Sequence, residues 1–260
     1  MMIVSQQNPK IKTVRRLQSS GRFRRQEQAF VAEGTRWLSE TVRSECEQRL
    51  VLYTEEWGAS RDHRQLLDKL SCEKSEVSFE VMKGISELET SEGVIAIVSF
   101  IEILPPENPT MFLIADGISD PGNLGTMIRT AAAAGINRVI LAPECVDAYN
   151  PKVVRGSMGA HLQIAVQRLS WPQIEAETSQ MSNWIAAAGN HVSYHQIDWT
   201  SPSSLIIGSE ANGASITAQK MFDGRVSIPM EREMDSLNVA VATGVILFES
   251  LRQRRYVGSE

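Results

Sequence analysis

The 260-residue sequence has few cysteines and lacks any long hydrophobic run. Cys46, Cys72 and Cys145 are widely spaced and form no CxxC pair, which argues against a disulfide framework and a cysteine zinc site. His191 and His195 lie four residues apart without a third ligand nearby. No apolar stretch approaches the roughly 20 residues that cross a bilayer, and no apolar segment precedes the N-terminal basic residues. We therefore predict a cytoplasmic protein with no metal and no membrane partner.

Two glycine-rich nucleotide-binding motifs are also missing. The sequence contains no GxGxxG, the usual dinucleotide fingerprint, and no GxxxxGK[ST], the phosphate-binding loop of nucleoside triphosphatases. Both absences disfavour a nicotinamide-dependent oxidoreductase and a nucleoside triphosphatase. Binding of a nicotinamide cofactor would restore the oxidoreductase as an alternative.

Acidic residues are absent from the first 26 positions, although the whole chain has a net charge of −5. The basic residues in this stretch are Lys10, Lys12, Arg15, Arg16, Arg22, Arg24 and Arg25. Basic residues gathered at one end of an acidic chain are typical of a segment that binds a polyanion such as RNA. A solvated basic helix that binds nothing is the alternative, and charge alone does not separate the two.

The local patterns predict two α/β domains. Strands and helices alternate over residues 29–101, with one expected strand at 77–82. Three prolines and no periodic pattern mark residues 102–110 as a linker. We therefore expect a smaller α/β sandwich over residues 1–101 and a second domain over residues 111–260.

Strands and helices alternate strictly in the second domain. The expected strands are residues 111–115, 138–142, 162–167, 192–197, 204–208 and 225–229. The expected helices are residues 123–134, 151–158, 173–188, 215–222 and 237–255. Such alternation predicts a mostly parallel sheet with helices on both faces. Ligands of these sheets bind beyond the carboxyl ends of the strands, so the loops there form the candidate site.

Three loop segments at this position stand out. The first is DGISDPGNLGTMIRTAAAAG at 116–135, and its part DPGNLGTMIRTAAAAG at 120–135 opens a helix whose single charged residue is Arg129. The second is GSEANG at 208–213, and the third is IPMEREMDSLNVAVATG at 228–244. Taken singly, each is explained equally well by a glycine turn or by close helix packing.

In this order, the three loops resemble motifs of the SpoU (TrmH-like) branch of the SPOUT methyltransferases, which 2′-O-methylate RNA with S-adenosylmethionine. NPKIKTVRRL, FVAEGTRWLSE and ELETSEGVIAIV, between residues 3 and 101, are similar to the substrate-binding domain that precedes the catalytic domain in many members. The resemblance implies an open parallel sheet with a deep trefoil knot, a ribosomal-protein-like N-terminal domain, a homodimer and S-adenosylmethionine as cofactor. General topology rules predict an unknotted chain, so the knot is expected from the resemblance alone.

The resemblance also implies which residues form the site. The catalytic set comprises Asn123, Arg129, Glu210, Ser236 and Asn238. The cofactor-binding set comprises Ile207, Gly208, Ile228, Pro229, Met230, Leu237 and Val239.

Methyl transfer constrains the roles of the polar residues. The ribose hydroxyl must lose its proton, and its oxygen must lie in line with the S–CH₃ bond. A guanidinium gives up its proton very reluctantly, so we expect Arg129 to hold a phosphate and to stabilise the forming alkoxide. Glu210 would orient Arg129 or an ordered water, and Asn238 would position the ribose or brace the loops.

Ribosomal RNA ranks ahead of transfer RNA as the expected substrate. A noncatalytic RNA-binding assembly factor that kept the fold is the alternative from another class. Retention of the polar residues favours the enzyme.

Overall fold

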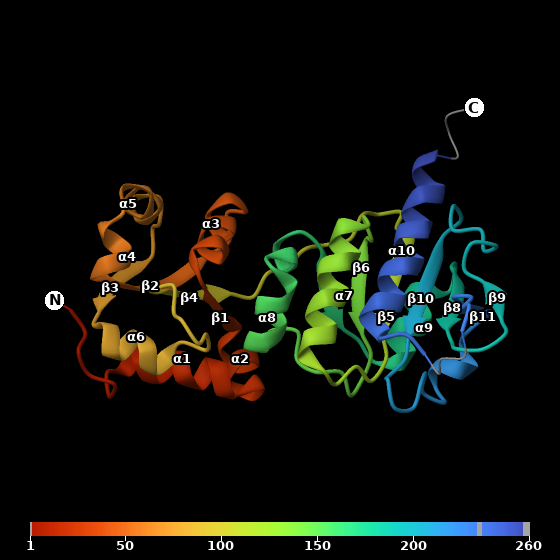
Figure 1. The fold of residues 1–260 in the computed structure, drawn as a ribbon, viewed down its shortest axis with the longest axis horizontal. Helices are drawn as coiled ribbons and strands as arrows, with labels where there is room; N and C mark the ends of the chain where they lie inside the picture. Colours follow the sequence, from red (N-terminus) through yellow and green to blue (C-terminus); the bar gives the residue numbers. More distant parts are fainter. Residues whose placement is uncertain (1, 233–235, 257–260) are drawn as a thin grey trace. The chain divides into compact units, whose positions relative to one another are not determined.

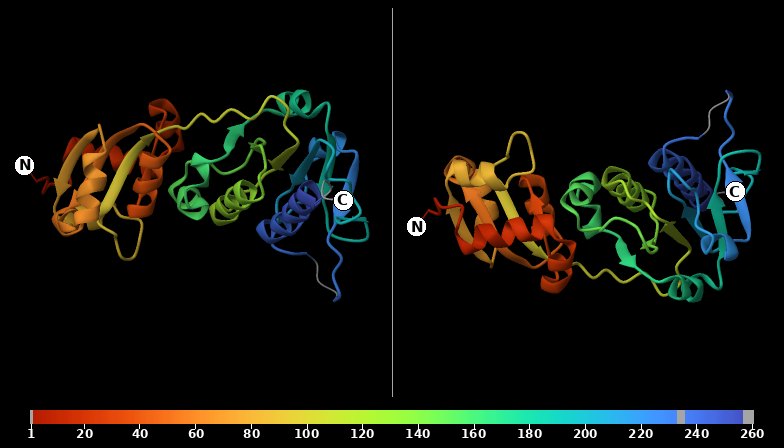
Figure 2. Two further views of the ribbon diagram at one scale, coloured as in Figure 1. Left: turned by 90° about the horizontal axis from the view of Figure 1, so that it is seen from above. Right: turned by 90° about the horizontal axis from the view of Figure 1, so that it is seen from below.

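The computed structural model describes residues 2–232 and 236–256, which form two compact units (Figure 1). The first unit contains the chain up to Glu102 and a later segment, Tyr149–Leu162. The second contains Ile103–Ala148 and the chain from Gln163 onward. Figure 2 shows the extended stretch before β5, in which residues 101–110 contain no helix or strand.

The first unit is built on a four-stranded sheet in the order β1-β4-β2-β3. Its strands are β1 Ala29–Glu33, β2 Gln48–Thr54, β3 Glu73–Val77 and β4 Val94–Ser99. β2 and β3 are parallel, and the other neighbours are antiparallel. The helices of this unit are α1 Pro9–Ser19, α2 Gly21–Glu27, α3 Thr35–Arg43, α4 Glu55–Ala59, α5 Arg61–Asp68, α6 Phe79–Ile85 and α8 Pro151–Ser157, and η1 Ala160–Leu162 is a 3₁₀ turn.

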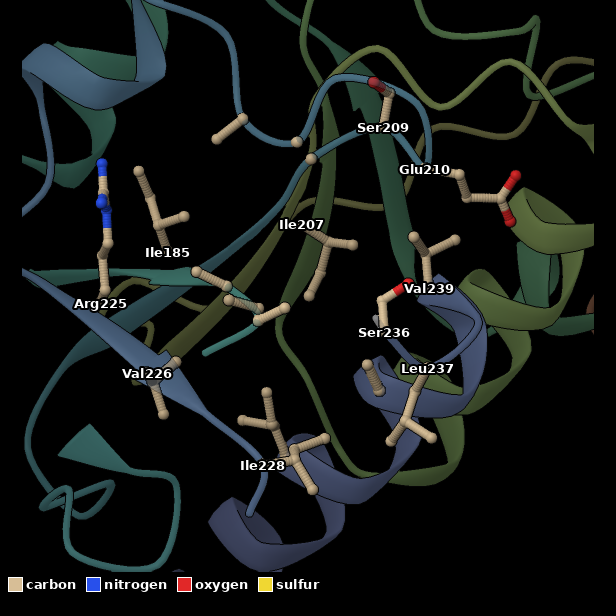
Figure 3. Close-up of a pocket in the computed structure, with 18 of the residues that line it drawn as sticks. Ile185, Ile207, Ser209, Glu210, Arg225, Val226, Ile228, Ser236, Leu237 and Val239 are labelled. Atoms are coloured by element: carbon tan, nitrogen blue, oxygen red, sulfur yellow. The ribbon is translucent and has the colours of Figure 1, made fainter. Parts of the chain in front are cut away.

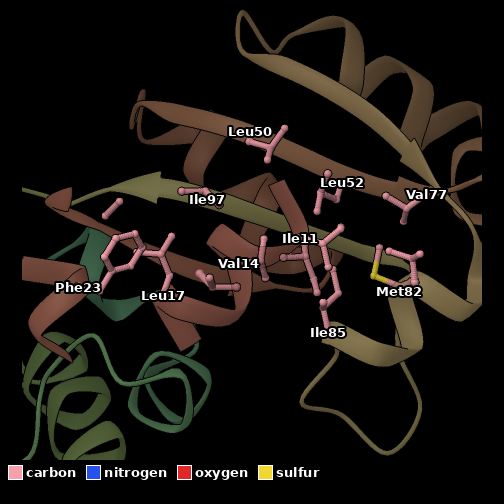
Figure 4. Packing of buried hydrophobic residues seen from close by; sticks show 14 residues of the cluster. Ile11, Val14, Leu17, Phe23, Leu50, Leu52, Val77, Met82, Ile85 and Ile97 are labelled. Atoms are coloured by element: carbon pink, nitrogen blue, oxygen red, sulfur yellow. The ribbon is translucent and has the colours of Figure 1, made fainter. Parts of the chain in front are cut away.

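Helix α1 covers one face of this sheet with three apolar residues at helical spacing. Ile11, Val14 and Leu17 are buried against Leu52 and Ile97 of the sheet (Figure 4). Asn8 caps the helix, and a proline occupies its first turn. The basic residues of α1 therefore lie off the buried face.

The opposite face of the sheet is completed by the segment Tyr149–Leu162. Val154 joins the core that contains Phe30, and the Tyr149 ring stacks on Phe100 at 4.0 Å between centroids. The chain departs here from the expected two-domain division, in which this segment belonged to the second domain. The physical reason is burial, because these aromatic and apolar side chains fill the core beside β1.

The second unit is built on a seven-stranded sheet in the order β7-β6-β5-β10-β8-β11-β9, and all its pairings are parallel. Its strands are β5 Met111–Ala115, β6 Arg138–Leu141, β7 Ala165–Arg168, β8 Ser182–Ala186, β9 Val192–Ser193, β10 Ser203–Ile207 and β11 Gly224–Ser227. The other elements are α7 Pro121–Ala133, α9 Trp171–Thr178, α10 Val239–Tyr256 and the 3₁₀ turn η2 Ala218–Lys220. The predicted parallel α/β sheet is confirmed.

Strands β5 and β10 lie side by side in register, with Ala115 opposite Ile207 at their carboxyl ends. The loops that follow these two strands therefore start from adjacent points. Helix α7, which lies within the first loop segment, packs against α10. All three candidate loops are thus attached to neighbouring elements.

Two expected elements are wrong. Residues 173–188 do not form one helix, because the chain leaves α9 and enters β8, which pairs with both β10 and β11. Residues 77–82 do not form a strand, because the Ser78 side chain accepts the amide of Val81 and starts α6. Non-local pairing overrides local helix propensity in the first case, and a helix cap overrides period-two spacing in the second.

Three further expected elements are shorter than predicted. Residues 162–167 give only β7, residues 192–197 give only β9, and residues 215–222 give only η2. Cys46, Cys72 and Cys145 are all free thiols. Within residues 2–232 and 236–256, every helix is too short or too polar to cross a membrane.

Candidate active site

The first loop places Asn123 in the opening turn of α7. The Asp120 carboxylate accepts the backbone amide of Asn123 at 2.7 Å and so caps the helix. Pro121 occupies the first helical position, where a missing amide hydrogen costs nothing. The cap fixes the backbone of Asn123 and leaves its side chain available to the site.

The second loop is closed tightly behind β10. Ser209 and Gly213 exchange two backbone hydrogen bonds, of 3.0 and 2.8 Å. A Cβ on Gly208 would collide with the backbone of Gly213 and Ala214, so only glycine fits there. The close approach holds Glu210 at the tip of the loop.

Asn123, Glu210 and Asn238 form a hydrogen-bonded cluster. The Asn123 amide donates to Glu210 Oε1, and Asn238 Nδ2 lies 3.0 Å from Asn123 Oδ1 and 3.4 Å from the same Glu210 oxygen. Asn238 Oδ1 also accepts the amide of Ala240 at 2.9 Å, which ties the cluster to the start of α10. Glu210 Oε2 has no partner among the described residues, so it is available to a substrate or a water.

A cavity of about 450 Å³ lies beside this cluster. Figure 3 shows Glu210 and Ser236 on one side of it and Ile185 and Arg225 on the other. The predicted cofactor residues that line it are Ile207, Gly208, Ile228, Met230, Leu237 and Val239. Pro229 is exposed and is not part of the lining. Residues 233–235 of the third loop are not described.

Comparison with known protein families identifies the family to which the chain belongs. The model of the SpoU rRNA Methylase family matches residues 110–248, and that of the MRM3-like substrate binding domain matches residues 8–96. The chain belongs to the SpoU rRNA methylase family. The predicted family and the predicted N-terminal substrate-binding domain are therefore confirmed.

Several relatives resemble this SpoU chain over nearly its whole length. An uncharacterized tRNA/rRNA methyltransferase of Synechocystis sp. is 32% identical, covering 97% of this chain and 94% of its own. A 23S rRNA (guanosine(2553)-2′-O)-methyltransferase of Bacillus subtilis is 29% identical, covering 95% of this chain and 97% of its own. The SpoU methyltransferase AviRb from Streptomyces viridochromogenes, crystallised with S-adenosylmethionine (AdoMet), superimposes with a TM-score of 0.88 at 27% identity, covering 96% of this chain and 99% of that one.

The cavity of this SpoU chain fits AdoMet in size and chemistry. Its volume of about 450 Å³ lies within the range of roughly 300–1,000 Å³ typical of small-molecule sites. Apolar side chains such as Ile207, Ile228 and Leu237 offer surface for an adenine ring, and the polar cluster stands at one side. Within the described part of the chain, no group of three or more His, Cys, Asp or Glu side chains is placed to hold a metal ion.

Sequence reasoning missed the wall that β8 contributes. Ile185, Ala186, Ala187 and Ala188 line the cavity, although this stretch was expected to continue a helix. The available signal was local: Trp184 and Ile185 favour a strand, and a Gly-Asn pair follows the alanines.

Arg129 is not part of the hydrogen-bonded cluster among the described residues of this SpoU chain. It is exposed on α7, six residues beyond Asn123, and no hydrogen bond or ion pair joins it to any described residue. Ser236 lines the cavity, but no hydrogen bond links it to the cluster within the described chain. The structure thus joins three of the five predicted catalytic residues by hydrogen bonds and places Ser236 on the wall of the adjacent cavity.

Arg24 does not belong to an RNA-binding surface. It is buried, with 3% of its surface exposed, and its Nη1 donates to the carbonyls of Leu17 at 2.5 Å and Gln18 at 3.0 Å. Its guanidinium therefore closes the junction of α1 and α2. The expectation for this residue is wrong because helix-end carbonyls inside the unit use its donors.

The other basic residues of α1 and α2 differ in their exposure and in their contacts with neighbouring side chains. Lys10 pairs with Glu73 at 2.6 Å, and Arg15 donates to the Gln6 side chain at 2.6 Å. Arg16 is exposed, and its guanidinium lies 3.9 Å above the Phe23 ring. The exposed cations of α1 and α2 are Lys12, Arg16, Arg22 and Arg25.

Proposed function

We propose that the protein transfers a methyl group from AdoMet to a ribose 2′-oxygen of ribosomal RNA. One observation carries the proposal: the Asn123–Glu210–Asn238 cluster stands beside a cofactor-sized apolar cavity in a SpoU chain. The relatives agree, since one is named a 23S rRNA 2′-O-methyltransferase and another was crystallised with AdoMet. The matched substrate-binding domain supports an RNA substrate.

AdoMet supplies an electrophilic methyl group on a sulfonium centre. The residues of the chain must then hold the ribose hydroxyl in line and receive its proton. The amide groups of Asn123 and Asn238 fix Glu210 through Oε1. Glu210 Oε2 is left to accept the hydroxyl proton, either directly or through one water.

The proposal includes a homodimer, in which Arg129 acts at the site of the partner chain. Val241, Val245 and Phe248 form an apolar stripe on α10, and Val241 and Phe248 are 54% and 49% exposed. Gly244, next to Val245 of the stripe, packs against α7, since a Cβ there would lie 3.7 Å from Thr130 Cγ2. A partner seated there would cover the stripe and bring Arg129 to the neighbouring site, where its charge would stabilise the forming alkoxide.

The remaining expectations complete the proposal. Lys12, Arg16, Arg22 and Arg25 bind the phosphates of the RNA, and the loops of the second unit carry the trefoil knot of the family. The protein works in the cytoplasm, where its RNA substrate is assembled. Ribosomal RNA stays ahead of transfer RNA because the named relative acts on 23S rRNA.

The test is methyl transfer by the purified protein. Methyl-labelled AdoMet is incubated with ribosomal RNA from cells that lack the gene, and the RNA is digested to nucleosides. A labelled 2′-O-methylnucleoside is expected, whereas a base-methylated nucleoside would contradict the proposal. Transfer to transfer RNA alone would favour the tRNA enzyme, and RNA binding without transfer would favour the assembly factor.

Substitution of Glu210 tests the role of the cluster. Glu210→Gln keeps the shape of the side chain and removes the proton acceptor, so turnover should fall by about 100-fold or more. AdoMet affinity, measured by calorimetry, should change by less than about threefold, because the cavity wall is intact. Unchanged turnover would remove Glu210 from the reaction.

A further inference from the structure

Asp116 is a buried carboxylate to which the family resemblance assigns no role. It directly follows β5 and is 4% exposed. Its backbone amide donates to the Ile207 carbonyl at 2.9 Å, which extends the pairing of β5 and β10 by one residue. Its side chain is therefore fixed at the carboxyl edge of the sheet, where the candidate loops begin.

The Asp116 side chain reaches across to the far end of the second loop. Asp116 Oδ2 accepts the backbone amide of Ser215 at 2.6 Å. Ser215 in turn accepts the amide of Ala218 through its hydroxyl at 3.2 Å, which starts η2. The bond from Asp116 thus stands where the loop that carries Glu210 returns to the fold.

The loop over residues 208–215 has internal and external anchors. Internally, Ser209 and Gly213 bond to each other through their backbones, which keeps the shape of the loop. Externally, Asn123 and Asn238 hold the Glu210 side chain at the tip, and Gln219 donates to the Ala214 carbonyl at 2.9 Å. The bond from Asp116 is the anchor that joins the end of the loop to β5, so it contributes directly to the position of the loop against the sheet.

This placement matters because the loop forms one wall of the cavity. Ser209, Glu210, Asn212, Gly213 and Ala214 all line it. We propose that Asp116 is a positioning residue that holds the Glu210 loop against β5 and thereby shapes the methyl-donor cavity. This inference rests on the proposed function, since it assigns AdoMet to that cavity.

A carboxylate at position 116 suits this hydrogen bond better than the neutral side chain of asparagine or alanine. A charged acceptor forms shorter and stronger hydrogen bonds to a backbone amide than a neutral one does. Asp116→Asn keeps an acceptor oxygen but loses the charge and buries an NH₂ group. Asp116→Ala removes the acceptor and leaves the Ser215 amide without this hydrogen-bond partner. The alanine variant should therefore raise the AdoMet Kd more than the asparagine variant does.

Asp223 provides a control in the same unit. Its Oδ2 accepts the backbone amide of Asn183 at 2.7 Å near the amino end of β8, at an exposed position. Asp223 does not line the cavity. Asp223→Ala therefore removes a bond of the same type, from carboxylate to backbone amide, without touching the Glu210 loop.

The experiment combines calorimetry and hydrogen exchange on the full-length protein. Asp116→Ala should raise the Kd for AdoMet by about tenfold or more and Asp116→Asn by a smaller factor, since a buried acceptor is lost or weakened. Amide exchange should accelerate in peptides that cover 208–216 and stay unchanged in those of the first unit. Asp223→Ala should leave the AdoMet Kd within about twofold of the unchanged protein.

Two results would overturn the inference. One is that neither Asp116→Asn nor Asp116→Ala changes the AdoMet Kd or the amide exchange rate of residues 208–216. The other is an equal rise in Kd for Asp223→Ala, which would indicate general destabilisation. If Asp116→Ala does not fold, the affinity and exchange of Asp116→Asn decide. Failure of the unchanged protein to bind AdoMet would instead contradict the proposed function.

Discussion

Gly208 occupies a position in the second loop that only glycine fits. The backbone of Gly213 and Ala214 occupies the space that a Cβ on Gly208 would need. Gly208→Ala should force the loop away from β10 and raise the AdoMet Kd by about tenfold or more, because overpacked sites cost roughly 1–3 kcal/mol. Calorimetry with AdoMet measures this directly.

Gly213→Ala is the control for that substitution. Gly213 has a positive φ of 66° but open space around a Cβ, so alanine there brings backbone strain without a collision. We expect a smaller loss of affinity, since this strain costs roughly 1 kcal/mol. Equal losses in the two variants would mean that the close approach at Gly208 contributes no more than the backbone strain that Gly213→Ala introduces.

At the residue scale, the sequence predicted the polar cluster better than the residues that support it. Asn123, Glu210 and Asn238 stand in recognisable loop motifs, so the resemblance identified them and the structure joins them by hydrogen bonds. Asp116 opens the first loop segment but received no role, and its bond to Ser215 spans 99 residues of sequence. A contact of that range depends on strand order, which local patterns do not encode.

The basic helices α1 and α2 separate two roles for arginine at the scale of an element. Arg22 and Arg25 are exposed, whereas Arg24 is buried between helix-end carbonyls. Arg22→Gln with Arg25→Gln should weaken RNA binding and reduce the slope of log K against log salt by about one to two units. The melting temperature should not change, because neither guanidinium supports the fold.

Arg24→Gln should behave in the opposite way. Its loss leaves buried carbonyls unpaired, so the melting temperature should fall by several degrees, while the salt slope stays the same. Thermal denaturation and a salt titration of RNA binding check both variants. If the slope of log K against log salt is unchanged in the Arg22 and Arg25 double variant, these exposed cations are solvated and do not contact RNA.

Elements with strong local signals were predictable, and those set by distant partners were not. The apolar run of β5 and the alanine-rich run of α7 predicted both elements within two residues, although α7 starts at Pro121 in what was expected to be a turn. β8 was missed because its position comes from pairing with β10 and β11, which lie later in the chain. The β8 wall of the cavity was missed for the same reason.

The largest departure from expectation concerns the whole molecule, since Tyr149–Leu162 belongs to the first unit. A polypeptide of residues 1–102 would expose the core surface that Tyr149 and Val154 cover. It should melt at least about 10 °C below the same polypeptide with residues 149–162 joined by a flexible linker. Calorimetric melting of both polypeptides gives the comparison, and equal melting temperatures would contradict the assignment of this segment.

The proposed homodimer predicts complementation between two inactive chains. Arg129→Ala and Glu210→Gln each disable the site to which their residue belongs. If Arg129 serves the partner's site, a mixed dimer holds one intact site, and an equal mixture should recover about a quarter of the unmutated turnover. If Arg129 serves its own site, no activity returns. The two variants are co-expressed in equal amounts so that mixed dimers form. Methyl transfer to RNA by the purified mixture then distinguishes the two arrangements.

The central claim is that this SpoU chain methylates a ribose of ribosomal RNA through the Glu210 cluster. It is tested most directly by mapping 2′-O-methyl groups across total RNA from cells that carry the unchanged chain, the Glu210→Gln chain or no copy. We predict that one ribosomal position loses its methyl group both in cells without the chain and in cells with Glu210→Gln. Identical maps in all three would contradict the claim.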